Sequence, residues 1–332
     1  MAPFFDPLNV LIVQEKAEEY AELIRERFPE QVKSGKIRIM TAHDENSLPD
    51  GVLDSHIIGT WPLLKEVPQM KHLQWVMTFS SGVDHWEKSK LLPPHVPLVH
   101  LPGGSAIPVS EFVIGLMLCL TKKYNQMWDN QKEARFIRIE GEELYGKTLG
   151  IIGLGGIGRA VAKRAKGFDM HIIGTDVHIT DVPFVDEVFL NDRVDDVIRQ
   201  SDFVLLSVPE TKETLGMMNE ERFRLMKPTA YFINCARGSL VIKEALIKAL
   251  NEGWIAGAAM DTFWIKNPLP SYLPPEDELW QAKNLIITPH ISSWTNMYSR
   301  RFGAVFVENI GRFMRGEPLI NIAPGFGVPM AS

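Results

Sequence analysis

Residues 148 to 176, TLGIIGLGGIGRAVAKRAKGFDMHIIGTD, decide the fold of this chain. An apolar run, a glycine cluster, a helical pattern and a second apolar run ending in an acid follow one another, which predicts strand, tight turn, helix and strand. Gly153, Gly155 and Gly158 match the spacing G-x-G-x-x-G. In that pattern the first glycine makes the turn, the second lets backbone amides approach a pyrophosphate, and the third lets the helix pack on the strand. The stretch therefore predicts a dinucleotide site.

The acid at the end of the stretch predicts which dinucleotide binds. Asp176 closes the second apolar run, 18 residues after Gly158. A carboxylate at this position accepts hydrogen bonds from the ribose hydroxyls of the adenosine half and repels a 2′-phosphate. We therefore expect NAD rather than NADP as the cofactor. The alternative is that the glycine turn only reverses the chain, in a remnant of the fold that binds no nucleotide.

Size and composition narrow the class of protein. A chain of 332 residues exceeds what one hydrophobic core usually organises, so two domains are expected. A net charge of -6 argues against nucleic acid as a partner. The most apolar segment, residues 112–120, is too short to cross a bilayer, and the N-terminus has no secretory pattern. Cys119 and Cys235 lack metal-ligand spacing, so we expect reduced thiols, no metal and a cytoplasmic location.

The order of predicted elements indicates two α/β domains. Strands are predicted at 8–13, 35–40, 55–60 and 73–78, with a charged helix at 14–28, and they form a first small unit. Residues 100–108, HLPGGSAIP, mark a hinge, and a long apolar helix follows over 109–124. Further strands are predicted after the glycine motif at 202–208, 230–234, 255–260 and 284–288.

The last helical stretch, residues 297–315, lies beyond the final strand. We expect it to return to the N-terminal unit, which makes that unit discontinuous. The predicted substrate-binding domain is residues 1–104 and 296–332, and the predicted cofactor domain is residues 105–295.

Candidate catalytic residues follow the predicted strands, because the crevice of a doubly wound sheet opens at the carboxyl ends of its strands. Arg237 and His290 stand at two such ends, and Asp261 stands at a third. An arginine fork holds a carboxylate and a carbonyl oxygen, while a histidine exchanges the hydroxyl proton. Each also has a structural interpretation: Arg237 as a surface ion pair, His290 as a satisfied structural residue and Asp261 as a helix cap.

Several ordered motifs resemble the D-isomer-specific 2-hydroxyacid dehydrogenase family. They are GLGGIGRA, SVPETKETLGMMNEERFRLMKPTAYFINCARGSLV, GAAMDTF and LWQAKNLIITPHISSWT, preceded by LQWVMTFSSGVDHW and IPVSEFVIGLML. The resemblance covers nearly the whole chain. It implies a Rossmann cofactor domain inserted in a flavodoxin-like substrate domain, both doubly wound with parallel sheets. It also implies an active site between the domains and a homodimer built on the cofactor domains.

The resemblance also assigns roles to individual residues. It implies that backbone amides of Ser81, Gly82 and Val83 bind the substrate carboxylate, that Arg237 orients the substrate, that Asp261 lies near the nicotinamide amide and that His290 is the acid/base. The predicted cofactor site comprises Gly153, Gly155, Gly156, Ile157, Gly158, Asp176, Pro209, Thr214, Cys235, Arg237, Asp261 and His290. Trp294 is a candidate for the wall of the substrate pocket, and Trp264 is the stronger candidate for a specificity wall.

One part of the family pattern is missing. A glutamate that hydrogen-bonds the catalytic histidine usually precedes a Pro-Leu-Pro-like turn, but here DTFWIKNPLP puts Asn267 before Pro268. Asn267 is thus the predicted catalytic partner of His290, in a loop that is longer than usual. An amide leaves a hydrogen bond but no charge, so imidazolium is less favoured and reduction should weaken at a lower pH. A carboxylate of Glu276, Asp277 or Glu278 folding back, or different chemistry, are the alternatives.

These features predict an NAD-dependent enzyme that transfers a hydride between the nicotinamide and a small 2-oxo or 2-hydroxy acid, with D-isomer specificity. Two alternatives stay open because the usual glutamate is absent. One is a reductase of an unusual keto acid or imine. The other is a catalytically weak protein that senses NAD(H). The side chain of the substrate and the physiological direction are not fixed by the sequence.

Overall fold

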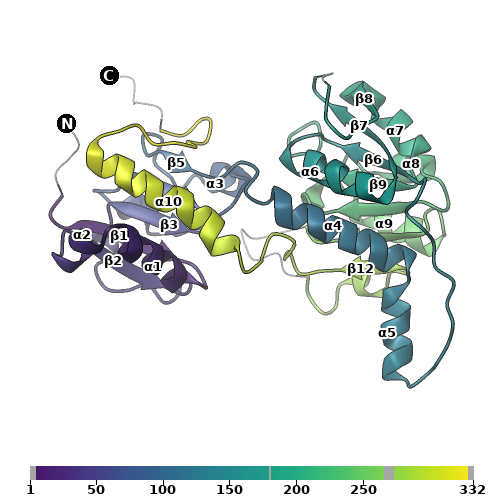
Figure 1. The fold of residues 1–332 in the computed structure, drawn as a ribbon, viewed down its shortest axis with the longest axis horizontal. Helices are drawn as coiled ribbons and strands as arrows, with labels where there is room; N and C mark the ends of the chain where they lie inside the picture. The colour runs from purple at the N-terminus through teal and green to yellow at the C-terminus, as the bar shows by residue number, and fades with distance from the viewer. Residues whose placement is uncertain (1–4, 179–180, 265–272, 328–332) are drawn as a thin grey trace. The chain divides into compact units, whose positions relative to one another are not determined.

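The computed structural model describes residues 5–178, 181–264 and 273–327. The chain divides into two compact units: unit 1 is Met1–Ser105 with Thr295–Ser332, and unit 2 is Ala106–Trp294. Each unit is built on its own parallel sheet with helices on both faces (Figure 1). The fold class predicted from the sequence, two doubly wound α/β domains, is confirmed.

Unit 1 contains a five-stranded sheet in the order β2-β1-β3-β4-β5, which is the flavodoxin-like order. Apolar runs such as LNVLIV form its strands because a parallel sheet is covered on both faces. Its strands are β1 (Leu8–Val13), β2 (Ile37–Ala42), β3 (Ile57–Thr60), β4 (Trp75–Thr78) and β5 (Leu98–Val99). Its helices are α1 (Ala17–Arg27), α2 (Pro29–Lys33), α3 (Asp84–Ser89) and α10 (Tyr298–Arg315).

Helix α10 returns from the end of the chain to pack on the unit 1 sheet beside α1 (Figure 1). Its Phe306 ring meets the Phe79 ring edge-on, with centroids 5.5 Å apart. Gly59 on β3 makes this packing possible, because a Cβ there would lie 2.5 Å from Phe79 and 2.8 Å from Phe306. The predicted return of the last helix is thus explained by an apolar face that is buried against the sheet.

Unit 2 contains a seven-stranded parallel sheet in the order β12-β11-β10-β9-β6-β7-β8. Its strands are β6 (Thr148–Ile152), β7 (His171–Asp176), β8 (Glu187–Leu190), β9 (Phe203–Leu206), β10 (Tyr231–Asn234), β11 (Gly257–Met260) and β12 (Leu285–Ile287). Its helices are α4 (Ala106–Thr121), α5 (Tyr124–Lys132), α6 (Gly156–Ala165), α7 (Val194–Gln200), α8 (Glu220–Leu225) and α9 (Lys243–Asn251).

Two cores cover the two faces of the unit 2 sheet. Side chains of α4 and α6 form one of them, and side chains of α7, α8 and α9 form the other. The strand order reverses between β6 and β9, which places a ligand crevice at the carboxyl ends of these strands. The glycine cluster follows β6 directly, so the fold puts it at this crevice.

The structure differs from the predicted elements mainly at edges and helix ends. The long apolar helix begins at Ala106 rather than at 109, because Pro108 is tolerated in a first turn whose amides have no intrahelical acceptor. Residues 122 and 123 end α4, and a separate helix, α5, follows. The short edge strands β5 and β8 were not predicted. Within the described ranges no helix is long and apolar enough to cross a membrane.

Candidate active site

The three glycines of the motif after β6 differ in what surrounds their Cβ positions. Gly153 has φ +100°, and a Cβ there would lie 2.7 Å from the Ser207 carbonyl oxygen. A Cβ on Gly158 would lie 2.2 Å from the Gly153 carbonyl oxygen, so only glycine lets α6 pack this closely. Gly155 has no atom within 4 Å of its Cβ position and caps the start of α6. The open side of the loop is therefore the side on which a phosphate can approach.

Asp176 ends β7 beside this loop. Its Oδ2 accepts a hydrogen bond from the Leu154 amide at 3.1 Å, and its Oδ1 accepts one from the Val177 amide at 2.7 Å. The side chain is half-buried. The carboxylate is therefore held next to the glycine loop, where a ribose of a dinucleotide would lie.

The loop after β9 is held by hydrogen bonds within the loop and by one hydrogen bond to the loop after β10. The Thr214 hydroxyl donates to the Pro209 carbonyl at 2.8 Å and accepts from the Thr211 amide at 2.8 Å. The Ser239 hydroxyl donates to Glu210 across to the loop that follows β10. The loop with Pro209 and Thr214 and the loop with Arg237 are thus fixed against each other.

Arg237 lies in the loop after β10, and a buried amide shapes that loop. The Asn234 Nδ2 donates to the Arg237 carbonyl at 2.7 Å, and the Asn234 Oδ1 accepts from the Ala236 amide at 3.0 Å. A Cβ on Gly238 would lie 2.2 Å from the Phe263 carbonyl carbon. The Arg237 loop therefore packs directly against the backbone that follows β11.

Asp261 follows β11 and holds the segment that carries His290. Its Oδ1 accepts from the Thr288 hydroxyl at 2.7 Å and from the Ile291 amide at 3.0 Å, and its Oδ2 accepts from the Ser292 amide at 3.0 Å. The Asp261 side chain is fully buried. His290 has φ +56°, a left-handed conformation that is uncommon outside glycine and clusters at functional sites. Asp261 is thus a positioning group for the histidine segment, a role that the sequence did not indicate.

The segment that follows β11 is anchored at Trp264. The Trp264 indole donates to the Val241 carbonyl at 2.7 Å and packs against the unit 2 core. The indole is therefore held in place by this bond, and its role as a specificity wall stays a prediction. Asn267 lies outside the described residues. Of the alternative carboxylates, Asp277 accepts from Lys243 at 2.8 Å and from the Leu279 amide at 3.0 Å, so it is already engaged.

Two further predicted residues have clear surroundings. Cys235 is buried, and this burial, together with the negative charge of Asp261, raises the pKa of its thiol well above the usual range. The thiol stays protonated at neutral pH, which argues against a redox-sensing role. Trp294 is 36 % exposed and is the last residue of unit 2. Within the described ranges no group of three His, Cys, Asp or Glu side chains could hold a metal ion.

Ser81, Gly82 and Val83 lie in unit 1, in the loop between β4 and α3. The Ser80 hydroxyl donates to the Gly82 carbonyl at 2.6 Å, which turns the loop. In the part of the chain that the structure describes, no protein acceptor takes the amides of Ser81, Gly82 and Val83. Three amides without acceptors in one turn favour an anion, since buried or half-buried N–H groups are otherwise paired.

Several residues that shape these loops are not among the site residues that the sequence predicts. Asn234 could have been found as the polar residue that ends the apolar strand YFIN. Thr288, in the segment TPH, carries no signal apart from its closeness to His290. His100 and Ser105 were noted only as part of a hinge, although they contact Ser81.

The fold and these loops together define a dinucleotide-binding protein of the α/β class. A family model for the NAD binding domain of D-isomer specific 2-hydroxyacid dehydrogenases matches residues 114–292. A glyoxylate reductase from Thermofilum pendens is 38% identical over 262 residues, which is 74% of this chain and 73% of the relative. The chain belongs to the D-isomer specific 2-hydroxyacid dehydrogenase family.

Solved structures agree with this family over almost the whole length. A D-lactate dehydrogenase from Aquifex aeolicus, complexed with NAD and lactic acid, has a TM-score of 0.74 and 28% identity and covers 93% of this chain and 96% of its own. A D-isomer specific 2-hydroxyacid dehydrogenase from Xanthobacter autotrophicus, in complex with NADPH and MES, has a TM-score of 0.77 and 26% identity and covers 95% and 98%. Both nicotinamide cofactors thus occur among its structural neighbours.

Proposed function

We propose that this protein is an NAD-dependent reductase or dehydrogenase of small 2-oxo or 2-hydroxy acids with D-isomer specificity. The observation that carries the proposal is the segment around His290, which has φ +56°. The fully buried Asp261 carboxylate accepts hydrogen bonds from Thr288, Ile291 and Ser292, on both sides of this histidine. Residues in sparsely populated backbone conformations cluster at active sites, and a histidine that follows a parallel strand stands where the crevice of a doubly wound sheet opens, which supports its role as acid/base.

Unit 2 supplies the cofactor residues in this proposal. The amides around Gly155 and Gly156 would bind the pyrophosphate, and the Asp176 carboxylate would accept from the adenosine ribose. Pro209, Thr214 and Cys235 would line the nicotinamide half through the loops after β9 and β10. When bound in this site, NADH would supply the hydride for C2 of a 2-oxo acid, and NAD would accept the hydride from C2 of a 2-hydroxy acid.

The remaining residues act on the substrate. Arg237 would pair with the carboxylate and the carbonyl oxygen of a 2-oxo acid, and the amides of Ser81, Gly82 and Val83 would bind the carboxylate. His290 would donate a proton to the carbonyl oxygen as C2 gains the hydride, so that the product is a neutral hydroxyl. In the oxidative direction the same nitrogen would take that proton back. Asn267 stays the proposed partner of His290, and Trp294 the proposed wall of the pocket.

The cofactor preference gives a direct test. Wild-type protein assayed with 2-oxo acids from glyoxylate to phenylpyruvate should oxidise NADH more efficiently than NADPH. Replacement of Asp176 by serine should lower the ratio of kcat/KM for NADH over NADPH by about 10- to 100-fold, because a charge-assisted hydrogen bond is worth about 1.5–3 kcal/mol. Asp192→Ser, an exposed aspartate of the same unit, is the matched control and should leave the ratio unchanged.

Two results would contradict this proposal in different ways. An unchanged ratio in Asp176→Ser would remove Asp176 from the cofactor site. Tight NADH binding without turnover of any 2-oxo acid would favour the NAD(H)-sensing alternative, while turnover of only bulky keto acids or of imines would favour an unusual substrate.

We also propose a homodimer formed through unit 2. We call residues 122–141 the arm. This segment begins and ends at the same point of unit 2. The Glu142 amide donates to the Thr121 carbonyl at 2.9 Å, and the Tyr231 hydroxyl donates to the Glu142 carboxylate at 2.8 Å. The arm contains α5 and is fixed at its base, and Figure 1 shows α5 projecting from the rest of unit 2.

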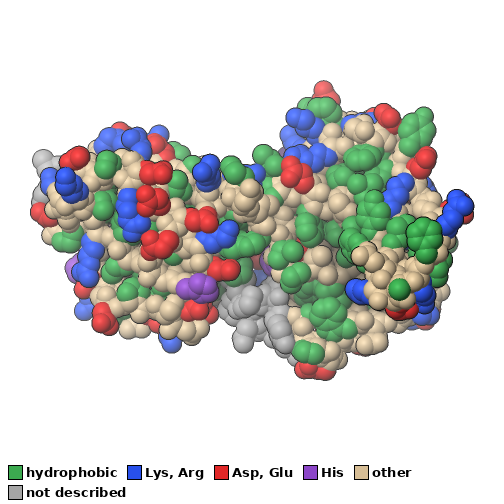
Figure 2. Space-filling model, turned by 60° about the horizontal axis from the view of Figure 1, so that its bottom comes forward, with side chains coloured by type: hydrophobic (Ala, Val, Ile, Leu, Met, Phe, Trp, Pro, Cys, Tyr) green, Lys and Arg blue, Asp and Glu red, His purple; other side chains and the backbone are tan. Residues whose placement is uncertain are grey.

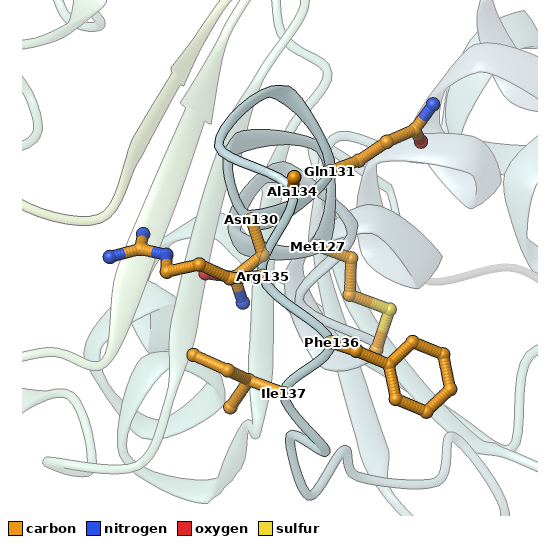
Figure 3. A pocket seen from close by; sticks show the side chains of 7 residues that line it. All are labelled: Met127, Asn130, Gln131, Ala134, Arg135, Phe136 and Ile137. Atoms are coloured by element: carbon orange, nitrogen blue, oxygen red, sulfur yellow. The ribbon is translucent and has the colours of Figure 1, made fainter.

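The arm exposes apolar side chains that a second copy could cover. Phe136 is fully exposed and Trp128 is 55 % exposed. A hollow beside them is lined by Met127, Asn130, Gln131, Ala134, Arg135, Phe136 and Ile137 (Figure 3). Aromatic side chains and methionine are enriched in protein interfaces. The arm has both a projecting aromatic ring and a hollow. In a dimer with a two-fold axis, the ring of each copy could therefore fill the hollow of the other.

Apolar side chains are not spread evenly over the visible surface. In Figure 2 hydrophobic side chains gather on unit 2, whereas Lys, Arg, Asp and Glu side chains are interspersed over both units. A surface of mixed charge with apolar side chains exposed on unit 2 favours a protein partner over a nucleic acid.

Light scattering should report the mass of two chains for the wild type and of one chain for the double variant Trp128→Glu, Phe136→Glu. Two buried carboxylates in an apolar interface are strongly unfavourable. Leu53→Glu, which changes an equally apolar and 42 % exposed residue of unit 1, should stay dimeric. A monomeric wild type would contradict the proposed dimer. A double variant that stays dimeric would show that the interface does not involve the arm.

A further inference from the structure

The chain passes between its two units twice, after Ser105 and before Thr295. Each of these passages is hydrogen-bonded, within unit 1, to residues 79–83, which we call the carboxylate loop. The loop follows β4 and contains the three amides that lack a protein acceptor among the described residues. The inference developed here rests on the proposed function, in which these amides bind the substrate carboxylate.

The first passage is tied to the loop by Ser105. The Ser105 and Ser81 hydroxyl oxygens lie 3.0 Å apart, and the Ser105 amide donates to the Ser81 hydroxyl at 3.2 Å. His100, five residues earlier, has its Nδ1 at 2.9 Å from the Ser81 carbonyl oxygen. A carbonyl oxygen only accepts, so this Nδ1 carries the proton. Both the side chain and the carbonyl of Ser81 are therefore held by the segment that leads into α4.

The second passage is tied to the loop by Tyr298. Tyr298 is the first residue of α10, and its hydroxyl donates to the Phe79 carbonyl. The side chain is buried, and burial raises the pKa of the phenol above its usual range. The hydroxyl therefore stays a donor at every pH at which the protein would be assayed.

Phe79 itself has little freedom to move. Its ring stacks on Tyr20 with centroids 4.0 Å apart and meets Phe306 edge-on. Its amide donates to the Thr60 carbonyl at 2.8 Å. With the Phe79 carbonyl held by Tyr298 and the ring held by the core, the start of the loop is fixed on both sides.

We propose that Ser105 and Tyr298, one on each passage of the chain between the units, are positioning residues that hold the carboxylate loop in the conformation that binds the substrate carboxylate. Neither residue touches the substrate in this arrangement. They act through Phe79 and Ser81. These residues come shortly before Gly82 and Val83 in the loop, whose amides bind the carboxylate in the proposed function. The predicted signature is weaker binding of carboxylate with unchanged binding of cofactor.

The test combines steady-state kinetics with calorimetric binding of oxamate, a carboxylate analogue of 2-oxo acids, to the NADH complex. Ser105→Ala and Tyr298→Phe should each raise the KM for a 2-oxo acid and the Kd for oxamate by about 3- to 10-fold, the usual effect of one hydrogen bond. The KM for NADH and kcat should change less than about 2-fold. Ser105→Thr, which keeps the hydroxyl, should restore much of the oxamate affinity.

Matched controls exclude a merely structural effect. Tyr20→Phe removes a phenol that is equally buried and stacks on Phe79 but does not bond its carbonyl. Ser55→Ala removes a buried hydroxyl that donates to the Val52 carbonyl, just before β3 begins. Both controls should bind oxamate as the wild type does, whatever their thermal stability.

Three outcomes are decisive. Weaker oxamate binding in Ser105→Ala and Tyr298→Phe, but not in the controls, supports the proposal. Unchanged oxamate binding in these two variants overturns it and leaves the proposed function standing. A wild type that binds NADH but neither binds oxamate nor turns over a 2-oxo acid overturns the proposed function, and this inference with it.

Discussion

Replacement of His290 by alanine is expected to lower kcat for reduction of a 2-oxo acid by about 10²- to 10⁴-fold, the usual contribution of a general acid. NADH should still bind to the variant, because the other residues of the predicted cofactor site are unchanged. The reason for the lower kcat is that, in the proposed function, His290 donates the proton that the carbonyl oxygen gains, and alanine has no group that can replace it. The measurement is kcat and KM over pH 5 to 9.

A second variant separates chemistry from backbone geometry. His290 has φ +56°, and alanine is strained in that conformation, whereas asparagine tolerates it. His290→Asn should therefore lose as much activity as His290→Ala while keeping more of the stability of the segment that Asp261 holds. His171→Ala, an exposed histidine of the same unit, is the control and should be fully active.

The pattern of loss tells which interpretation holds. If His290→Asn keeps wild-type kcat and the same pH dependence, His290 is not the acid/base, and the strained segment has another purpose. If both variants lose activity but the wild-type profile is unchanged by pH, the proton comes from elsewhere and His290 only orients the substrate.

Two glycines of the same motif, Gly155 and Gly158, are expected to have different effects when changed to alanine: one change weakens cofactor binding and the other lowers stability. Gly158→Ala should destabilise unit 2 by about 1–3 kcal/mol, as overpacking does, because the new Cβ would lie 2.2 Å from a backbone oxygen. Gly155→Ala should leave stability within about 0.5 kcal/mol, because nothing lies within 4 Å of its Cβ and its φ is -69°. In the proposed function its methyl group would instead stand where the pyrophosphate approaches.

The readouts are thermal unfolding and calorimetric NADH binding. Gly155→Ala should weaken NADH about 10- to 100-fold, the loss of a charge-assisted hydrogen bond, at an unchanged Tm. Gly158→Ala should lower the Tm by several degrees. Gly167→Ala is the matched control, since its Cβ position is also open, and it should change neither value. Full NADH affinity in Gly155→Ala would place the cofactor away from this loop.

The fold could be predicted largely because its determinants are local. Apolar runs such as LNVLIV and TLGII become buried parallel strands, and the glycine spacing fixes one strand, turn and helix. The short strands β5 and β8 were missed because two or four residues at a sheet edge carry almost no periodic signal. The end of α4 was missed because Lys123 turns left-handed there, and no glycine or proline announces it.

For the candidate site, the sequence proposes which residues take part but not which of them hold one another. Arg237, Asp261 and His290 stand out because polar residues follow three apolar strands. That the Asp261 carboxylate holds the His290 segment depends on β11 and β12 being neighbours in the sheet, across 27 to 31 residues of sequence. The bond from Trp264 to the Val241 carbonyl has no sequence signal for the same reason, because that carbonyl belongs to a separate loop.

The sequence by itself determined the class of fold, the position of the dinucleotide motif and the residue types at the strand ends, because these depend on short-range pattern and glycine geometry. Tertiary structure alone decided which groups hold one another: Asp261 with the histidine segment, Asn234 with the Arg237 loop, and Ser105 and Tyr298 with the carboxylate loop. Hydrogen bonds between loops have no sequence period, since they exist only after strands that are far apart in the chain have aligned.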